Sequence, residues 1–423
     1  MKVLGVTDSD SYTKWGASIL SQMPAGWDRS LVIIRTPALP SERQRESALA
    51  GTDFAATNTP LVDLADLAAL VAAERPDVVL LAVRGPVVRV LVRMIVSAVS
   101  DRPLIVSGLP GISIPATLLA LYYRSQVDLL ILHSKREIAE FRALARTWSI
   151  EQEFGLATLP FLSAVQGVAG GGDDIVFAAQ AKVPKLLPER ERLLGWLVAT
   201  ARAQPHRRVI LKLRGVTGEA QTHSERYPFD VMLAELPDVP DNLIVSTGPM
   251  SEHLERAGAL VTVSSTAAIE AIALGVPVLA IDDFGVSAGL INLVFEGSGL
   301  LGGSDRLIAG DIPSPDPEWL AANYFQAPAE NTWVAAIEAG VARRLQGPLP
   351  LRAQFRATLG GNLRRIWDRK RALGQYDRTL GGYLALAVGL PLRGAVRRYR
   401  AVRSRLIGPA VPAAELVAPR PRA

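Results

Sequence analysis

Short runs of apolar residues recur along the first part of the chain, and stretches with apolar positions at helical spacing separate them. Uninterrupted apolar runs of this kind are typical of parallel strands that are covered on both faces. The runs predict strands at Val3–Val6, Ser30–Ile34, Val78–Val83, Leu104–Ser107 and Leu129–Leu132. Together with the helical stretches between them, they predict a Rossmann-like α/β domain over residues 1–166.

A second series of apolar runs begins after the glycine-rich segment Val165–Gly172. It predicts strands at Asp174–Ala179, Arg208–Leu213, Asn242–Ser246, Leu260–Val263 and Val276–Ile281. The same reasoning predicts a second Rossmann-like domain over residues 173–347. Two α/β domains joined by a glycine-rich hinge are expected to face a cleft, with ligands at the C-terminal ends of the strands.

The last part of the chain, residues 348–423, is arginine-rich and helical in pattern and ends in a Pro/Ala-rich tail that we expect to be disordered. Residues 352–423 contain 16 Lys or Arg against three acids, a net charge of +13, while the rest of the chain contains 30 against 38, a net charge of −8. The apolar run Tyr383–Leu392 is too short to span a bilayer and precedes a cluster of arginines. This basic helical extension predicts attachment to an anionic membrane surface, with a merely solvated helix as the alternative.

Composition narrows the classes of site and partner. The chain contains no cysteine, which excludes disulfides, cysteine-ligated zinc and a cysteine nucleophile, and its four histidines lack metal-ligand spacing. We therefore expect no metal site and no cofactor. The acidic body carries no nucleic-acid module, so we expect no nucleic-acid partner. No phosphate-loop or dinucleotide fingerprint is present, which argues against a kinase or a dehydrogenase. The N-terminus shows no secretory signal, which favours the cytoplasm, including the inner face of the plasma membrane.

The most informative stretch of the sequence is Val261–Asp282. It predicts a buried strand, a hydroxyl-rich turn, a short helix with one glutamate, a glycine stop and a second strand. Free backbone N–H groups and the hydroxyls of Ser264, Ser265 and Thr266 would converge at the start of the helix, which suits a phosphate. Glu270 would lie one turn deeper, within reach of a sugar hydroxyl. The alternative is an ordinary unit in which Ser264 caps the helix and Glu270 is solvated.

Further candidates for binding such a phosphate and sugar, called donor-binding residues below, follow other strands of the second domain. Gln180 and Lys182 lie in the predicted loop after its first strand, where they could contact a base, sugar or phosphate. Alternation places Lys212 and Arg214 on one side of a core strand, which is costly unless they meet an anion or pair with acidic residues. His223 could donate a further hydrogen bond to phosphate, although a lone histidine more often has no role in a binding site.

The loop after the first strand, Thr7–Trp15, is unusually polar. Asp8 or Asp10 could serve as the general base that takes a proton from an acceptor hydroxyl. Lys14 could hold an acidic acceptor, although capping of the next helix by Ser9 or Asp10 is the alternative explanation. The predicted acceptor-binding residues share positions after strands of the first domain: Ser9, Lys14, Ser107 and Gly108.

These motifs resemble a known enzyme class. The Ser264-Ser265-Thr266 turn with Glu270 and Gly275-Val276-Pro277 is similar to bacterial capsule and sialic-acid-type transferases of the two-Rossmann-domain (GT-B) class. Residues 1–345 more closely resemble a group of uncharacterised bacterial glycosyltransferases that open with an Asp-Ser-Asp-Ser-Tyr-x-Lys-Trp motif, here Asp8–Trp15. Gln180–Pro184 and Thr222-His223 also look like that group.

The resemblance implies a metal-independent glycosyltransferase of polysaccharide or capsule biosynthesis. Its donor would be a nucleotide-sugar, with an acidic sugar such as sialic acid on CMP favoured, and its acceptor a surface glycan or glycolipid. A sugar-nucleotide epimerase of the same fold and a non-catalytic scaffold of polysaccharide assembly remain alternatives.

Overall fold

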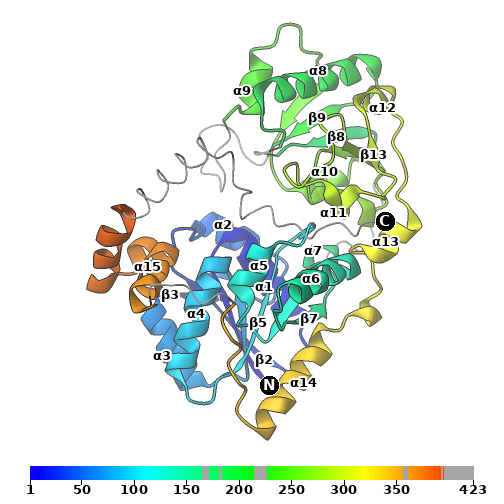
Figure 1. Ribbon diagram of the computed structural model, residues 1–423. Helices are drawn as coiled ribbons and strands as arrows, with labels where there is room; N and C mark the ends of the chain where they lie inside the picture. Colours follow the sequence, from blue (N-terminus) through cyan, green and yellow to red (C-terminus); the bar gives the residue numbers. More distant parts are fainter. Residues whose placement is uncertain (164–170, 181–182, 214–225, 356–360, 392–393, 395–423) are drawn as a thin grey trace. The chain divides into compact units, whose positions relative to one another are not determined.

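The computed structural model describes residues 1–163, 171–180, 183–213, 226–355, 361–391 and 394. Most of the predicted glycine-rich hinge, residues 164–170, therefore lies outside the described part of the chain. The chain divides into two compact units, shown in Figure 1. Unit 1 combines Met1–Pro160 with the described residues from Pro328 onward, and unit 2 comprises Phe161–Ala327.

The sheet of unit 1 consists of seven parallel strands in the order β3-β2-β1-β4-β5-β6-β7. The strands are β1 (Lys2–Thr7), β2 (Asp28–Ile34), β3 (Leu61–Val62), β4 (Val78–Ala82), β5 (Leu104–Gly108), β6 (Leu129–Leu132) and β7 (Glu153–Leu156). Its helices are α1 (Asp10–Ser21), α2 (Glu42–Leu49), α3 (Leu64–Glu74), α4 (Gly85–Ala98), α5 (Leu118–Arg124), α6 (Lys135–Thr147), α14 (Trp333–Gln346) and α15 (Gly361–Leu373).

Helices cover both faces of this sheet because successive strand residues point to opposite sides. Val3, Leu80 and Val106 pack into a core with α1 and α14. Their neighbours Leu4 and Val79 belong to a second core with α3, α4 and α15. This two-sided burial explains why the strands read as uninterrupted apolar runs.

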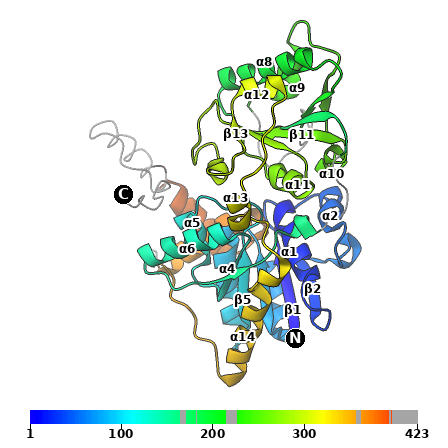
Figure 2. The same cartoon turned by 90° about the vertical axis from the view of Figure 1, so that its right-hand side faces the viewer.

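Unit 2 contains a six-stranded parallel sheet in the order β10-β9-β8-β11-β12-β13. The strands are β8 (Asp174–Ala178), β9 (Val209–Lys212), β10 (Leu243–Ser246), β11 (Ala257–Thr262), β12 (Val278–Ile281) and β13 (Leu301–Gly302). The helices are α7 (Pro160–Ser163), α8 (Leu187–Ala203), α9 (Phe229–Ala234), α10 (Met250–Leu254), α11 (Ala267–Ala273), α12 (Ser304–Ala309) and α13 (Pro317–Ala322). Figure 2 shows α8 and α12 side by side on one face of this sheet.

The predicted α/β class with two Rossmann-like units, as expected of the GT-B class, is confirmed. Three strands escaped the sequence pattern: β3 and β13 are two residues long, and β7 begins with Glu153 and contains Gly155. The described part of the basic extension contains helix α15 and the helical residues 380–391, whereas residues 348–355 are not helical. The predicted tail, residues 395–423, lies outside the described residues. None of the helices in the described part of the chain is long and apolar enough to cross a membrane.

The second unit ends earlier than the sequence suggests. The sequence analysis placed residues 328–347 in the second domain, whereas α14 packs against β5, β6 and β7 of unit 1. A Cβ atom on Gly155 would lie 2.9 Å from the backbone of Trp333, and one on Gly340 would lie 2.6 Å from Leu104. The chain therefore returns to unit 1 at Pro328.

Candidate functional site

In unit 2, the order of the strands reverses between β8 and β11, and the side chains that follow these strands meet. The Ser264 hydroxyl donates a hydrogen bond to Oε1 of Gln180 over 2.7 Å. Below this pair, the Thr262 hydroxyl donates to the carbonyl of Ala178 over 3.2 Å. The structure thus brings two of the predicted donor-binding residues together at the point where ligands bind in open α/β sheets.

The turn between β11 and α11 is stabilised by its own hydroxyl groups. The backbone N–H of Ser265 donates to Oγ1 of Thr262 over 3.1 Å, and that of Ala267 donates to Oγ of Ser265 over 3.2 Å. Thr266 is the N-cap residue of α11, so the interpretation of Ser264 as its cap does not hold. Thr266 and Glu270, in the first turn of α11, are both half-buried.

Lys212 ends β9, which is separated from β11 by β8 in the sheet. It is 7% exposed and lies in register with Ala178 of β8 and Ser246 of β10. A lysine so close to the core has lost most of its hydration, which favours an interaction with an anion or another polar group. The other predicted cationic candidates, Lys182, Arg214 and His223, lie outside the described residues.

A buried arginine that the sequence analysis missed holds the loop after β8. Arg190 of α8 is 1% exposed and donates to the carbonyls of Gln180, Pro184 and Tyr227 over 3.0, 2.9 and 2.6 Å. Its guanidinium also lies over the ring of Phe229, 4.3 Å from the centroid. These contacts fix the backbone of Gln180, so Arg190 positions the Ser264–Gln180 pair indirectly.

In unit 1, the corresponding reversal lies between β1 and β4. Asp8 follows β1 and is fully buried; its two carboxylate oxygens accept the backbone N–H of Arg84 over 3.1 Å and Nε of Arg84 over 2.8 Å. A second guanidinium nitrogen of Arg84 donates to Oγ1 of Thr36, over 3.0 Å. This network joins the ends of β1, β2 and β4.

Burial raises the pKa of Asp8, and the ion pair with Arg84 opposes that rise. Two other candidate residues sit beside it: Ser9 is the N-cap residue of α1 without a side-chain cap bond, and Asp10 is the first residue of α1. Both are half-buried, whereas Lys14 is exposed. Of the two predicted bases, Asp10 is therefore the one with an accessible carboxylate.

The predicted acceptor-binding residues Ser107 and Gly108 have structural partners in unit 1. The buried Ser107 hydroxyl donates to the carbonyl of Leu81 over 2.8 Å and accepts Nε of Arg124 over 3.2 Å. The same guanidinium donates to the hydroxyl of Tyr12 over 2.7 Å. Gly108 lies under Trp15, where a Cβ atom would come within 2.2 Å of the indole.

Trp15 also bonds to a buried histidine. Its indole N–H donates to Nε2 of His133 over 2.7 Å, and Nδ1 of His133 lies 3.0 Å from the carbonyl of Ala157. Nδ1 therefore carries the proton of a neutral ring. Burial lowers the pKa of His133 to about 4.

In the described part of the chain, no group of three or more His, Cys, Asp or Glu side chains could hold a metal ion.

Comparison with known proteins adds evidence from sequence families and solved structures. Residues 3–340 match the model of the family described as "Putative glycosyltransferase (DUF6716)". No curated protein matches the sequence.

Solved structures similar to this chain include both epimerases and glycosyltransferases. UDP-GlcNAc 2-epimerase from Neisseria meningitidis, bound to UDP-GlcNAc, is 12% identical; the match covers 82% of this chain and 100% of that chain, with a TM-score of 0.48. Spinosyn forosaminyltransferase SpnP is 15% identical, with 82% and 95% covered and a TM-score of 0.40. UGT2 of Phytolacca americana, in complex with UDP-2-fluoro-glucose and pterostilbene, is 10% identical, with 81% and 93% covered and a TM-score of 0.44.

The family model spans both Rossmann-like units and includes both points at which the strand order reverses. The chain therefore belongs to this glycosyltransferase family.

Proposed function

We propose that the protein transfers a sugar from a nucleotide-sugar donor, bound in unit 2, to a hydroxyl of a glycan or glycolipid acceptor. The observation that carries this proposal is the Ser264–Gln180 hydrogen bond at the reversal point of the unit 2 sheet. It places a hydroxyl and an amide where the strands end and a helix begins. Family membership supports glycosyl transfer as the reaction class.

In this proposal, the turn of unit 2 holds the donor phosphate. Ser264, Ser265 and Thr266 supply hydroxyl and backbone donors, and Glu270 accepts hydrogen bonds from the sugar. Lys212 stabilises the negative charge that develops on the departing phosphate. Lys182 and Arg214 would add positive charge and His223 a hydrogen-bond donor, which suits an acidic sugar. The resemblance to sialic-acid-type transferases is the reason to favour CMP as its carrier.

On the acceptor side, Asp10 is the better general base. Proton transfer requires a carboxylate within hydrogen-bond reach of the acceptor hydroxyl. Asp8 is fully buried with both oxygens bound to Arg84, so reaching a substrate would require breaking that ion pair. We therefore propose Asp8 as a positioning residue and Asp10 as the base, with Ser9 and Lys14 contacting the acceptor.

A nucleotide screen tests the donor site first. The purified protein is heated with CMP, CDP, UDP, GDP or dTDP, with and without Mg²⁺, and the melting temperature is recorded. A nucleotide that binds the folded state should raise it by mass action. Selective stabilisation by CMP supports the CMP-sugar donor. Selective stabilisation by a nucleoside diphosphate would mean that the donor sugar is carried on that diphosphate instead. No response to any nucleotide contradicts the proposal.

A donor-consumption assay then separates transfer from epimerisation. The nucleotide-sugar selected by the screen is incubated with the protein, with and without a glycan acceptor, and the products are identified by mass spectrometry. Release of nucleotide that depends on acceptor supports transfer, whereas an epimerised donor without acceptor supports the epimerase alternative. Glu270→Gln should weaken donor binding about tenfold, while Glu235→Gln, at an exposed glutamate of unit 2, should leave it unchanged.

A further inference from the structure

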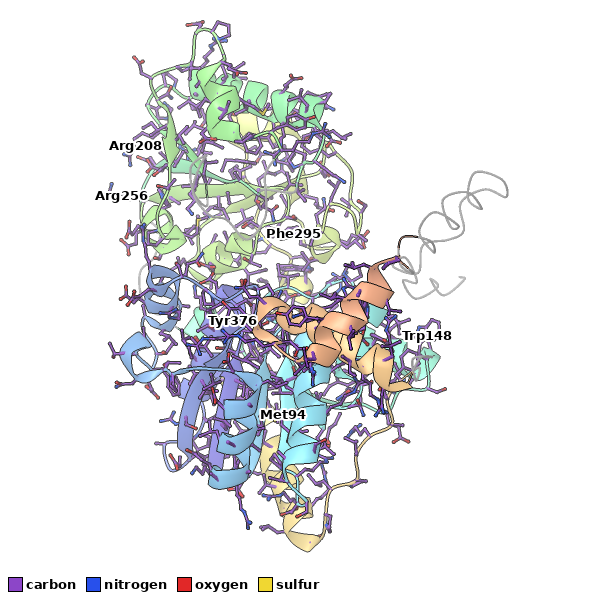
Figure 3. All side chains as sticks on the ribbon, turned by 90° about the vertical axis from the view of Figure 1, so that its left-hand side faces the viewer. Met94, Trp148, Arg208, Arg256, Phe295 and Tyr376 are labelled. Carbon is purple, nitrogen blue, oxygen red and sulfur yellow. The ribbon has the colours of Figure 1, made fainter. Side chains whose placement is uncertain are left out.

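The first helix of the basic extension contributes to the core of unit 1. Ala372 and Leu373 of α15 are buried in the same core as α3 and α4. Residues 380–391 continue as a helix, in which a Cβ atom on Gly389 would lie 2.3 Å from the ring of Trp367. Figures 1 and 3 both show α15 against α4, and Figure 3 labels Met94 on the α4 side of this contact.

A cavity of about 380 Å³ lies between α3, α4 and α15. This volume is at the lower end of the range for small-molecule sites. Most of its wall is apolar: Leu64, Ala68, Val90, Met94, Ala98 and Ile366. Such a wall accommodates an alkyl chain and offers few hydrogen-bond partners to a polar solute.

Ser97 and three arginines complete the lining: Arg93, Arg365 and Arg369. Arg93 donates to the neutral side chain of Gln354 over 2.9 Å, and Arg369 is paired with Asp377 at 3.0 Å. The exposed side chain of Arg365 makes no hydrogen bond or ion pair with any residue in the described ranges. The lining contains no carboxylate among the residues that the structure describes.

Positive charge is concentrated around Arg93. Arg89, one turn earlier on α4, is 7% exposed, and one of its terminal nitrogens has no hydrogen-bond partner among the described residues. Burial and the charges of Arg89 and Arg365 lower the pKa of Arg93. The carboxylate that opposes them, Asp368, also forms an ion pair with Arg364 at 3.1 Å. An anion in the cavity would relieve this repulsion.

We propose that this cavity binds one anionic lipid, with its alkyl chain against the apolar wall and its acidic headgroup on Arg365 and Arg93. A free inorganic anion would leave the apolar wall unused, and a neutral lipid would leave the guanidinium groups without a counter-charge. Charge complementarity therefore selects a molecule that has both parts.

The surface beside the cavity suits a bilayer. Leu380 and Leu384 of the helical segment 380–391 are 83% and 67% exposed, and Val388 and Leu390 are about half exposed. An exposed apolar helix face next to arginines is the pattern of a helix that lies in the membrane interface. The lipid would then come from the membrane to which this face attaches.

This site is separate from the proposed transfer chemistry. Arg84, the N-cap residue of α4, contacts Asp8, whereas Met94 lies ten residues further along α4, which is about 15 Å at 1.5 Å per residue. Loss of lipid binding and loss of nucleotide binding can therefore be measured independently.

Titration calorimetry with the full-length protein tests the proposal with three probes: decyl phosphate below its micelle concentration, decanol and inorganic phosphate. We expect decyl phosphate to bind at least about tenfold more tightly than either of the others, because only it satisfies both parts of the site. Equal binding of inorganic phosphate would indicate a plain anion site, and equal binding of decanol a plain apolar cavity. Either result, or no binding of decyl phosphate, would overturn the proposal.

Matched variants locate the binding. Arg365→Gln should weaken decyl phosphate binding about tenfold, and Ala68→Phe should abolish it by filling the cavity. Arg371→Gln removes the same charge from α15 outside the cavity, and Ala69→Phe adds the same ring at an exposed neighbour; both should bind as the wild type does. Equal losses in Arg371→Gln and Arg365→Gln would mean diffuse attraction, against the proposal.

Flotation with vesicles of phosphatidylcholine, alone or mixed with phosphatidylglycerol, identifies the source of the lipid. We expect binding only to the mixed vesicles, and a reduction in Ala68→Phe but not in Ala69→Phe. If Ala68→Phe loses decyl phosphate but still floats like the wild type, the ligand is a free amphiphile and the membrane source is refuted.

Discussion

The two sheets reverse their strand order in the same way, but the side chains at the reversal differ. In unit 1 a fully buried carboxylate, Asp8, is held by two donors of Arg84. In unit 2 the corresponding place holds a neutral pair, Ser264 and Gln180. Removing the partner of a buried carboxylate is strongly unfavourable, whereas a neutral hydrogen bond can be exchanged for one to a ligand at little net cost. Unit 2 is therefore the better suited of the two to bind and release a ligand at this point.

Both units also place a buried arginine beside the reversal point. Arg124 in unit 1 binds hydroxyls of Ser107 and Tyr12, and Arg190 in unit 2 binds three backbone carbonyls. A guanidinium has five donors in a rigid fork, so one such residue can hold several segments at once. In both units, then, a buried arginine holds the loops at the reversal point, while the side chains at that point differ.

The largest expected effect comes from the half-buried carboxylate of Asp10, beside the unit 1 network. Asp10→Asn should lower the rate of sugar transfer at least about 100-fold, because loss of a general base typically costs two to four orders of magnitude. Nucleotide binding in unit 2 should not change. Asp28→Asn, at an exposed aspartate where β2 begins, is the matched control. Loss of nucleotide binding together with activity would contradict the assignment of Asp10.

Arg190→Met should break the support of the unit 2 loop. Three charge-assisted hydrogen bonds would be lost in a buried place, so we expect unit 2 to lose about 3 kcal/mol of its free energy of unfolding. Any nucleotide response should weaken with it. Arg192→Met, at an exposed arginine of the same helix, should change stability by less than about 1 kcal/mol. Similar losses in both variants, measured by urea unfolding, would argue against a special role for Arg190.

The stability of the two units should also respond differently to acid pH. His133 has a pKa of about 4 in the folded protein and an ordinary value of 6.5. Between these values the unfolded chain binds a proton that the folded unit 1 does not, so stability is lost as pH falls. At pH 5 the loss relative to neutral pH should be about 2 kcal/mol. Hydrogen exchange in urea, compared for β1 and β6 against β8 and β11, would measure it.

A variant isolates the histidine in that experiment. Burial raises the pKa of Asp8, which acts in the opposite direction, so the wild type reports the sum of both groups. His133→Gln keeps an acceptor for Trp15 and should flatten the acid dependence of unit 1. His206→Gln, at an exposed histidine of unit 2, should not. Equal acid sensitivity in both variants would show that His133 is not the cause.

The smallest effect belongs to the neutral pair itself. Ser264→Ala removes one hydrogen bond and leaves Oε1 of Gln180 without its donor, so we expect unit 2 to lose about 1 kcal/mol of stability. If the hydroxyl also contacts the donor, nucleotide affinity should fall by about fivefold to tenfold. Ser251→Ala, at an exposed serine of α10, controls for the substitution. Unchanged affinity in Ser264→Ala would remove this serine from the proposed site.

The sequence was sufficient to predict the parts of the fold that depend on burial. Strands such as Val78–Ala82 are buried on both faces and therefore appear as continuous apolar runs. The edge strand Leu61–Val62 is too short to produce a pattern. The place of α14 could not be read locally, because its amphipathic pattern does not say which of two sheets it covers.

The candidate site was only partly predictable. Ser264 and Gln180 could be found because polar residues follow buried strands, and such residues meet where parallel strands end. Arg84 carried the same signal, directly before Gly85 and Pro86, and was overlooked. Arg190 carried none: it lies in the alternating charges of Glu189-Arg190-Glu191-Arg192, which are typical of a solvated helix face.

The position of α14 sets an order of events on the ribosome. Leu104 of β5 is covered by α14 only after Gly340 has been synthesised. At a synthesis rate of roughly 5–20 residues per second, the interval between these two residues is roughly 10 to 50 s. Unit 2 is complete at Ala327, before α14 has been made. We therefore expect the inserted unit to fold first, while the part of the earlier sheet that α14 covers, at β5, β6 and β7, stays exposed and available to chaperones. Proteolysis of nascent chains arrested at residues 327 and 380 would reveal this order as protection of unit 1 in the longer chain alone.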